Sequence, residues 1–199
     1  MKLLLIGASG TIGSIVHEEM KKDAEIITAG IEQADIIVDM TSPDSIKQMY
    51  EQAGPIDAVV NTAGVEHYGF LQEMTPEQNQ IAVQSKLSGQ INIVLLGMDA
   101  LSDNGSFTLT TGILMDDPIV KGASAAMANG GVRAFVKSAA IELPRGIRIN
   151  HVSPTILEAS VEKNGHLFPG FEPVSARRVG LAYRKSIMGA QTGKGIYVY

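Results

Sequence analysis

Three glycines spaced three residues apart form the first stretch of this sequence that is suited to chemistry. They lie in GASGTIG at positions 7–13, after an apolar run and at the start of a helical pattern over 11–22. Gly7 allows a tight turn, Gly10 allows backbone to approach a pyrophosphate, and Gly13 allows a helix to pack closely on a strand. Free N–H groups at the helix start favour a phosphate. The stretch predicts a nucleotide-binding turn, and a purely structural glycine-rich turn is the alternative.

Polar residues follow two later apolar runs in the same way. Asp39 ends the run DIIVD, and the segment NTAG at 61–64 follows the run DAVV. The carboxyl ends of adjacent parallel strands line the ligand crevice of an open α/β sheet. We therefore expect Asp39 and NTAG to lie beside the glycine turn, although each of them alone is typical of an ordinary turn at a strand end.

The composition limits the classes of protein to which the chain can belong. With 199 residues, 45% of them hydrophobic, it can bury one sizeable core, and we expect a single domain over residues 1–199. The net charge of −5 and the lack of a long Lys/Arg run argue against nucleic acid or a membrane surface as a partner. Cysteine is absent and the histidines show no ligand spacing, so we expect no metal site. No run reaches the length of a membrane span or a signal-peptide core, which favours a cytoplasmic protein.

Short apolar runs alternate with helical patterns along the chain. We expect strands at 2–6, 25–28, 35–39, 57–60, 106–110, 147–152 and 195–199, and helices at 11–22, from 42–43 onward, from 75 to about 102 and over about 120–143. Continuous apolar strands between helices are typical of a parallel sheet covered on both faces. The crossover rule then favours a single-domain, Rossmann-type, doubly wound α/β fold with a parallel sheet of about seven strands. The stretch 153–175, rich in Pro, Gly and Phe, is predicted to be an irregular loop that acts as an active-site lid.

Taken together, these motifs resemble the short-chain dehydrogenase/reductase family over nearly the whole chain. The resemblance rests on GASGTIG, Asp39 and NTAG, on GSFTLTT at 105–111 and QTGKG at 191–195, and above all on KSAAIELPRGIRINHVSP at 137–154. It implies an oxidoreductase that transfers a hydride between NAD(P)(H) and a small carbonyl or alcohol substrate. The glycine spacing differs from the G-x-x-x-G-x-G of most short members and looks like that of extended or atypical ones, and the chain is shorter than usual.

The resemblance also implies where a dinucleotide would bind. The implied residues come from the glycine turn, from two strand ends near the adenine and from a segment near the nicotinamide: Gly7, Ser9, Gly10, Thr11, Ile12, Gly13, Asp39, Met40, Asn61, Ala63, Gly64, Pro154, Ile156 and Leu157. The second strand has no acid at its end, where a carboxylate would hold the 2′-hydroxyl of NAD, and this favours NADP. Ile31 stands where an arginine would bind the 2′-phosphate, so NAD is the alternative.

The acid–base pair of the family is missing from this chain. The family uses a tyrosine and, four residues later, a lysine whose charge lowers the pKa of the phenol. No tyrosine occurs between Tyr68 and Tyr183. Alignment on RGIRIN places Ala125 at the tyrosine position and Asn129 at the lysine position, both within KGASAAMANGG at 121–131.

Three other residues are predicted to carry the chemistry. Thr111 is next to the position of the family serine, and Lys86 stands where the family has an asparagine. Our hypothesis is that the polar pair is exchanged between facing helices, with Lys86 near the nicotinamide ribose and Asn129 as its partner. A solvated Lys86 and an irregular helix at Asn129 are the alternative. The apolar surroundings of Lys86 in the stretch 80–98 favour a partner for its charge.

Several further side chains have two interpretations. His67 and Tyr68 follow NTAG and could face a substrate, but such loop residues are more often surface residues. His151 is expected to be a hydrogen-bonded histidine of the core. Phe168 and Phe171 either line an apolar pocket or hold their loop in place.

Two functions follow from the sequence. The leading one is an NAD(P)(H)-dependent oxidoreductase with a non-standard catalytic set and a small-molecule substrate. The other is an NADP(H)-binding sensor or interaction protein without turnover, and a non-redox enzyme is a third option. The resemblance also implies a homo-oligomer, a dimer or tetramer, in which the two long helices pair; the apolar stretches 80–98 and 132–141 permit such pairing.

Overall fold

The apolar run KLLLI becomes an interior strand of a parallel sheet, because its side chains alternate between two separate cores. Leu4 and Ile6 pack in the larger core cluster on one face, whereas Leu3 and Leu5 pack in the second cluster on the opposite face. Neither face of this strand is left to water, which explains why its sequence is apolar throughout rather than alternating.

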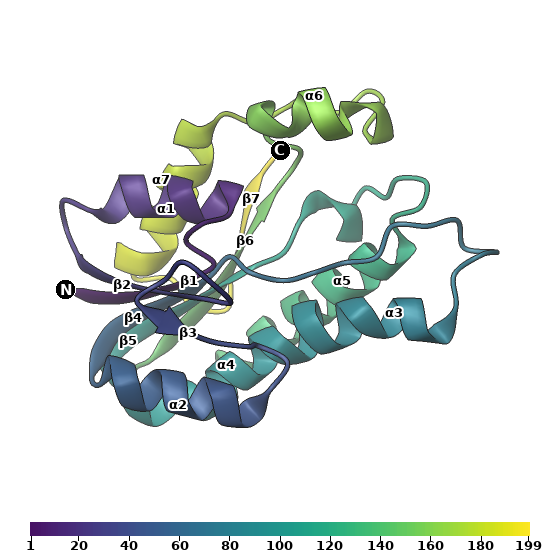
Figure 1. Cartoon of the computed structure of the whole chain (residues 1–199). Helices are drawn as coiled ribbons and strands as arrows, with labels where there is room; N and C mark the ends of the chain where they lie inside the picture. The colour runs from purple at the N-terminus through teal and green to yellow at the C-terminus, as the bar shows by residue number, and fades with distance from the viewer.

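The computed structural model describes all residues 1–199 and contains one sheet of seven parallel strands (Figure 1). The strands are β1 (Lys2–Ile6), β2 (Glu25–Gly30), β3 (Ile36–Ile37), β4 (Ile56–Asn61), β5 (Leu101–Thr110), β6 (Arg148–Pro154) and β7 (Gly195–Val198). Their order is β3-β2-β1-β4-β5-β6-β7, with every neighbouring pair parallel. The order reverses between β1 and β4, and this point is where an open α/β sheet leaves a crevice for ligands.

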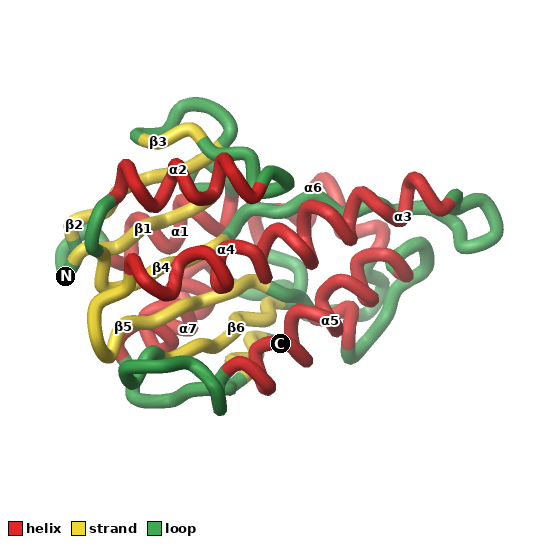
Figure 2. Tube along the Cα trace, turned by 90° about the horizontal axis from the view of Figure 1, so that it is seen from below, coloured by secondary structure: helices red, strands yellow, loops and turns green.

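Two layers of helices cover the sheet, as Figures 1 and 2 show. One face carries α1 (Thr11–Met20) and α7 (Ala176–Met188), which pack side by side. The other face carries α2 (Pro43–Ala53), α4 (Gln90–Gly97) and α5 (Ala123–Ala139). A short α3 (Pro76–Ala82) and the π-helical segment Val83–Gly89 lead into α4, so the three together form one long rod.

The predicted fold class is confirmed, and the expected caps are present. Ser42 caps α2 by accepting a hydrogen bond from the Ser45 N–H, and Thr75 forms a capping box with Gln78 at the start of α3. Both helices place a proline in their first turn, where the missing N–H costs no hydrogen bond.

Element boundaries differ from the predicted ones in three places. The helix expected up to about 102 ends at Ala100, because Leu101 pairs with Ile56 and begins β5. The helix expected over about 120–143 is confined to α5, since Gly122 precedes it and Ala140 ends it. Helix α7 was not predicted; its apolar residues Val179, Tyr183 and Ile187 recur at four-residue spacing and are buried.

The irregular loop expected over 153–175 contains more local structure than predicted, and its role as a lid stays a prediction. Pro154 still belongs to β6, and the chain then forms three short helical segments, Glu158–Ser160, α6 (Val161–Asn164) and Gly165–Leu167. A β-bridge between Leu157 and Val174 joins the two ends of this helical stretch. Helical turns satisfy the backbone polar groups that an irregular loop would have exposed.

No helix of the structure is both long enough and apolar enough to cross a membrane.

Close packing between α2 and α4 gives a test of the fold. The Tyr50 hydroxyl donates a 2.7 Å hydrogen bond to the Ile93 carbonyl, and a Cβ added at Gly97 would overlap this phenol. We expect Gly97→Ala to destabilise the protein by about 1–3 kcal/mol through overpacking. The melting temperature should fall by about 2–4 °C per kcal/mol. Gly130→Ala is the matched control, because a Cβ there meets nothing within 4 Å; an unchanged melting temperature for Gly97→Ala would contradict the prediction.

Candidate active site

The turn after β1 has the geometry that the glycine spacing predicts. Gly7 adopts φ of +84°, and a Cβ there would lie 2.8 Å from the backbone nitrogen of Ala63. A Cβ at Gly13 would overlap the Gly7 carbonyl, so α1 approaches the strand as closely as backbone allows. Gly10 precedes helix α1 as its N-cap, and the helix has no side-chain cap and no acid in its first turn. The N–H groups at this helix start are therefore available to an anion.

A large cleft of about 580 Å³ lies beside this turn, and we call it the main cleft. It is lined by the glycine turn, by the ends of β2 and β4, by the segment 38–41 and by residues 81, 84 and 85. Seven of the residues predicted to contact a dinucleotide line it: Gly7, Ser9, Gly10, Asp39, Met40, Ala63 and Gly64. Asp39 is the only charged residue among its lining.

Asp39, which follows β3, is held in place by hydrogen bonds from Thr41. Its carboxylate accepts hydrogen bonds from the hydroxyl of Thr41 at 2.7 Å and from the backbone N–H of Thr41 at 2.8 Å. The hydroxyl, followed by the backbone N–H, lowers the pKa of this exposed carboxyl. Asp39 is therefore an ionised, oriented acceptor at the edge of the main cleft.

Three residues of the predicted dinucleotide set lie outside the lining of both cavities: Thr11, Gly13 and Asn61. Asn61 is fully buried and shapes the turn instead, because its amide donates to the Ala63 carbonyl at 2.9 Å. The hydroxyl of Thr62 donates to the carbonyl of Ile6 at 2.9 Å and joins this turn to β1. The segment NTAG thus holds the two strand ends together at the crevice.

A second, smaller cavity of about 150 Å³ gathers the residues predicted for catalysis, and we call it the inner cavity. Lys86, Thr111 and Asn129 all line it. The remaining predicted cofactor residues line it too: Ile12, Pro154, Ile156 and Leu157. Five segments far apart in sequence therefore bring together the side chains that the family resemblance implies at the nicotinamide.

The partner of Lys86 differs from the expected one. Its ammonium lies 3.0 Å from the Oε1 of Glu66, and both side chains are largely buried, with 12% and 14% exposed. Asn129 makes no hydrogen bond to Lys86, and its Oδ1 is buried without a partner. The proposed Lys86–Asn129 pair is therefore wrong, because a nearby carboxylate neutralises the lysine more effectively than an amide does. The interpretation of Lys86 as a solvated lysine is also wrong.

Thr111 presents a hydroxyl that is already oriented. Its Oγ1 lies 2.8 Å from the Nδ1 of His151 and also donates to the Val152 carbonyl at 3.3 Å. His151 is a buried, hydrogen-bonded histidine, as expected from the sequence. Burial, followed by the positive charge of Arg133, lowers the pKa of His151 to about 4. The imidazole is neutral at physiological pH.

The small residues at the start of α5 are packed against other side chains. Ala125, at the family's tyrosine position, is fully buried in a cluster with Ile113 and Leu114. Phe168 and Phe171 pack against this cluster and against each other, edge to face, with ring centroids 5.5 Å apart. Phe168 also lines the inner cavity and so fits both interpretations, whereas Phe171 does not line this cavity.

Three residues outside the predicted catalytic and cofactor sets also lie at the inner cavity, two of them in the segment after NTAG. Glu66, Tyr68 and Thr155 line the inner cavity. Tyr68 lines the inner cavity and also keeps 42% of its surface exposed, so both of its interpretations hold in part, whereas His67 lies outside the cavity lining. The only signal in the sequence was position, because residues that follow a strand end in this fold face the crevice.

The buried His151 gives the site a measurable dependence on pH. Its folded pKa of about 4 lies below the ordinary value of 6.5, so the unfolded chain binds more protons between these values. Stability is therefore complete above pH 6.5 and falls as the pH drops toward 4, by up to about 3 kcal/mol. Asp116, Arg133 and Lys137 are the charged groups that act on this imidazole. We expect His151→Gln to lose less stability than wild type in urea titrations across this range. Replacement of the exposed His17 by Gln should leave the wild-type slope, and equal slopes for His151→Gln and wild type would contradict the prediction.

Sequence comparison relates the chain to reductases. The family model described as enoyl-(acyl carrier protein) reductase matches residues 7–183. Oxidoreductase UcpA from Escherichia coli is 29% identical over 159 residues, which cover 74% of this chain and 59% of that protein. Acetoacetyl-CoA reductase from Paracoccus denitrificans is 30% identical over 112 residues, 55% of this chain and 46% of that protein. The chain thus spans about half the length of these two relatives.

Comparison of structures gives the same relationship. The protein lin1944 from Listeria innocua is 61% identical, and each chain is covered to 100% with a TM-score of 0.99. A small-chain dehydrogenase in complex with NADPH shares the fold at 22% identity, with 100% of this chain and 96% of that one covered and a TM-score of 0.88. The match over residues 7–183 and the seven-stranded parallel sheet show that this chain belongs to the short-chain dehydrogenase/reductase family.

Proposed function

We propose that this protein is an NADP(H)-dependent oxidoreductase that transfers a hydride to or from a small carbonyl or alcohol substrate. One observation carries the proposal: the main cleft and the inner cavity meet at Gly64 and Lys86. Gly64 lines the main cleft and Lys86 lines the inner cavity, and a Cβ at Gly64 would lie 2.8 Å from the Cδ of Lys86. A dinucleotide in the main cleft can therefore extend its reactive end to the polar side chains of the inner cavity.

The residues present fit such a dinucleotide. The left-handed Gly7 and the uncapped start of α1 suit a pyrophosphate, and the oriented Asp39 suits an adenosine group. Ile12 and the segment 154–157 would hold the nicotinamide end. When bound, the cofactor supplies or accepts the hydride, and the protein supplies orientation and proton delivery.

The preference for NADP over NAD rests on the end of β2. Gly30 and Ile31 line the main cleft there, with no carboxylate to bind the 2′-hydroxyl of NAD or to repel a 2′-phosphate. A related small-chain dehydrogenase contains NADPH, which also supports this choice. Because no lysine or arginine lines the main cleft, NAD is the alternative.

The inner cavity favours a small, uncharged substrate. Its volume is about 150 Å³, and apolar walls are provided by Ile113, Leu114 and Phe168. The charge of Lys86 is balanced by Glu66, so the cavity offers no free cation to an acidic substrate. We assign the amide of Asn129 to a hydrogen bond with the substrate oxygen, and Lys86 to electrostatic stabilisation of the charge that develops there. The Thr111 hydroxyl, already bonded to His151 and the Val152 carbonyl, serves as a fixed polar wall of the cavity.

Binding at the main cleft is tested with a charged residue in the glycine turn. We expect Gly10→Asp to abolish the fluorescence change on NADPH titration, because a carboxylate at the helix start repels the pyrophosphate. Gly130→Asp is the control, since this position has free space and lies outside both cavities. Parallel titration with NADH should give the weaker binding. Wild-type binding by Gly10→Asp would show that the nucleotide does not occupy this turn.

Turnover is tested at Lys86. NADPH oxidation with a panel of aldehydes, ketones and quinones should show activity in wild type and a loss of about 100-fold in Lys86→Met. Lys86→Arg should retain part of the activity, because it keeps a positive charge beside Glu66. Intact turnover in Lys86→Met would remove Lys86 from the catalytic set. Tight NADPH binding without oxidation of any substrate in wild type would favour the sensor function instead.

The predicted homo-oligomer and cytoplasmic location stay predictions. Two exposed apolar side chains, Leu95 on α4 and Ile141 just after α5, suit a pairing of the long helices. Size-exclusion chromatography with light scattering measures the oligomeric state directly.

A further inference from the structure

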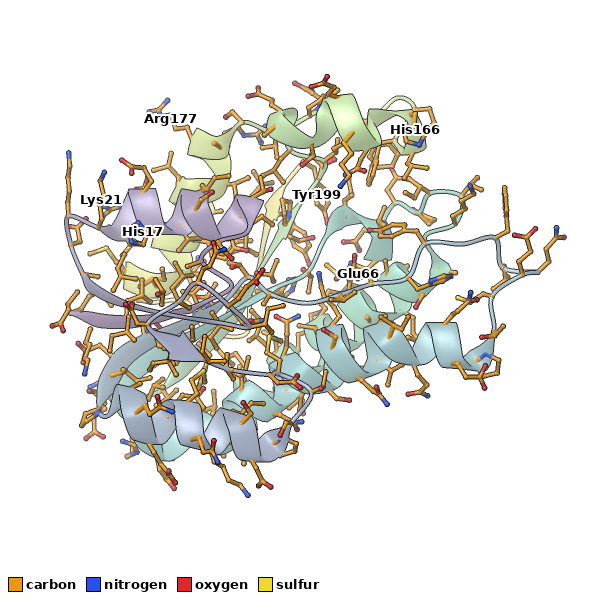
Figure 3. All side chains as sticks on the ribbon, in the orientation of Figure 1. His17, Lys21, Glu66, His166, Arg177 and Tyr199 are labelled. Atoms are coloured by element: carbon orange, nitrogen blue, oxygen red, sulfur yellow. The ribbon has the colours of Figure 1, made fainter.

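A tyrosine reaches the inner cavity from an unexpected direction. Tyr68 lies on the segment between β4 and α3, whereas the family's tyrosine position on α5 holds Ala125. Figure 3 shows the neighbouring Glu66 on this same segment, where the chain leaves the sheet. The cavity therefore contains a phenol, although the helix that supplies it in other family members offers only a methyl group.

Tyr68, Glu66 and Lys86 form one connected chain of polar groups. The Tyr68 hydroxyl donates a 3.0 Å hydrogen bond to the Oε2 of Glu66. The other carboxylate oxygen of Glu66, Oε1, lies 3.0 Å from the Lys86 ammonium. Glu66 and Lys86 are the only charged residues that line the inner cavity. Glu66 is thus held by a hydrogen bond at Oε2 and by an ion-pair contact, without hydrogen-bond geometry, at Oε1.

Burial and polarity distinguish this chain of groups from a surface ion pair. The side chains of Glu66 and Lys86 are 14% and 12% exposed, so the pair is shielded from solvent. Tyr68 keeps 42% of its surface exposed and connects the pair with water. Burial of the phenol, followed by the charge of Glu66, raises the pKa of Tyr68. The phenol therefore stays protonated unless the carboxylate accepts its proton as another proton arrives.

We propose that Tyr68 and Glu66 form the proton path to the substrate oxygen in this protein, an inference that rests on the oxidoreductase function proposed above. Tyr68 is the catalytic residue that touches the substrate. Glu66 acts through Tyr68 as a proton relay, and Lys86 positions Glu66. Thr111 is less suited to this role, because its hydroxyl is bonded to His151 and the Val152 carbonyl.

The proton inventory of the step balances. In the oxidising direction, which starts from the ionised Glu66 of the structure, the alcohol carbon loses a hydride to the oxidised nicotinamide cofactor of the proposed function, and the O–H bond of the alcohol breaks as the carbonyl π bond forms. The Tyr68 oxygen gains the alcohol proton while the Tyr68 hydroxyl passes its own proton along its hydrogen bond to the Glu66 carboxylate. Glu66 then releases that proton to solvent and is again a carboxylate paired with Lys86. Carbonyl reduction runs through the same transfers in reverse, once solvent has protonated Glu66.

The path is tested with a pair of matched tyrosine variants. Tyr68→Phe should lower kcat for NADPH-dependent reduction of diacetyl or phenanthrenequinone by about 100-fold or more, the usual worth of a general acid. Its NADPH affinity should match that of wild type, since Tyr68 lies outside the lining of the main cleft. Tyr199→Phe is the control, because it loses a hydrogen bond to the Asp116 carboxylate of the same 3.0 Å length outside the inner cavity.

The role of Glu66 has a readout that needs neither cofactor nor substrate. In protein labelled at the tyrosine ζ-carbon, the Tyr68 signal is identified by its absence from Tyr68→Phe. We expect this signal to shift in Glu66→Gln, because an amide replaces the carboxylate that accepts the phenol proton. The same variant should lower kcat by about 10-fold or more while KM stays within about two-fold, a split that a purely structural defect does not produce.

The outcomes separate the two proposals. Wild-type kcat in Tyr68→Phe overturns the proton path and leaves the oxidoreductase function standing. An unmoved Tyr68 signal in Glu66→Gln overturns the link between the two residues. If wild-type protein binds NADPH but reduces no carbonyl in the panel, the oxidoreductase function fails, and the proton path fails with it. Loss of activity in Tyr68→Phe and Glu66→Gln, with Tyr199→Phe unaffected, supports the path.

Discussion

The approach of bare backbone at the end of β1 is the constraint on which the site depends. A Cβ at Gly7 would crowd the Ala63 nitrogen, and a Cβ at Gly13 would overlap the Gly7 carbonyl. Without side chains at these points, β1, β4 and α1 converge, and the crevice at the strand-order reversal stays open to a ligand. At the end of the neighbouring strand β4, the buried Asn61 and the Thr62 hydroxyl stabilise this arrangement with hydrogen bonds to the Ala63 and Ile6 carbonyls. Nucleotide cleft and fold thus share one set of contacts.

Where a local pattern determines structure, the sequence was sufficient to predict it. Apolar runs placed the strands within a few residues, and capping residues placed the starts of α2 and α3. Boundaries decided by tertiary contacts were missed, as where Leu101 leaves the helix to pair with Ile56. The segment 153–175 was misjudged because its Pro and Gly residues indicate turns without excluding the short helices between them.

The candidate site could be predicted only as far as the family resemblance extends. Alignment brought Lys86, Thr111 and Asn129 to one cavity, but it could not supply the partner of Lys86. That partner, Glu66, comes from the segment after β4, which carries no motif of its own. Pairing between distant segments depends on how a loop folds back, and neither periodicity nor spacing records this. The exchanged pair inferred from residue types alone therefore failed.

Burial of the Glu66–Lys86 pair has an unfavourable desolvation free energy. Removing two charges from water is expensive, and buried ion pairs often contribute less to stability than apolar residues of similar size. The Lys86 side chain is largely buried within its helical rod, so a nonpolar residue there would fold at least as readily. A pair of this kind, beside a tyrosine and the open Oδ1 of Asn129, is more readily explained by chemistry in the inner cavity than by stability. Under the proposed proton path, the methyl group of Ala125 on α5 and the charged chain on the segment after β4 explain each other: the proton source lies across the cavity from the family's position, beside the same main cleft.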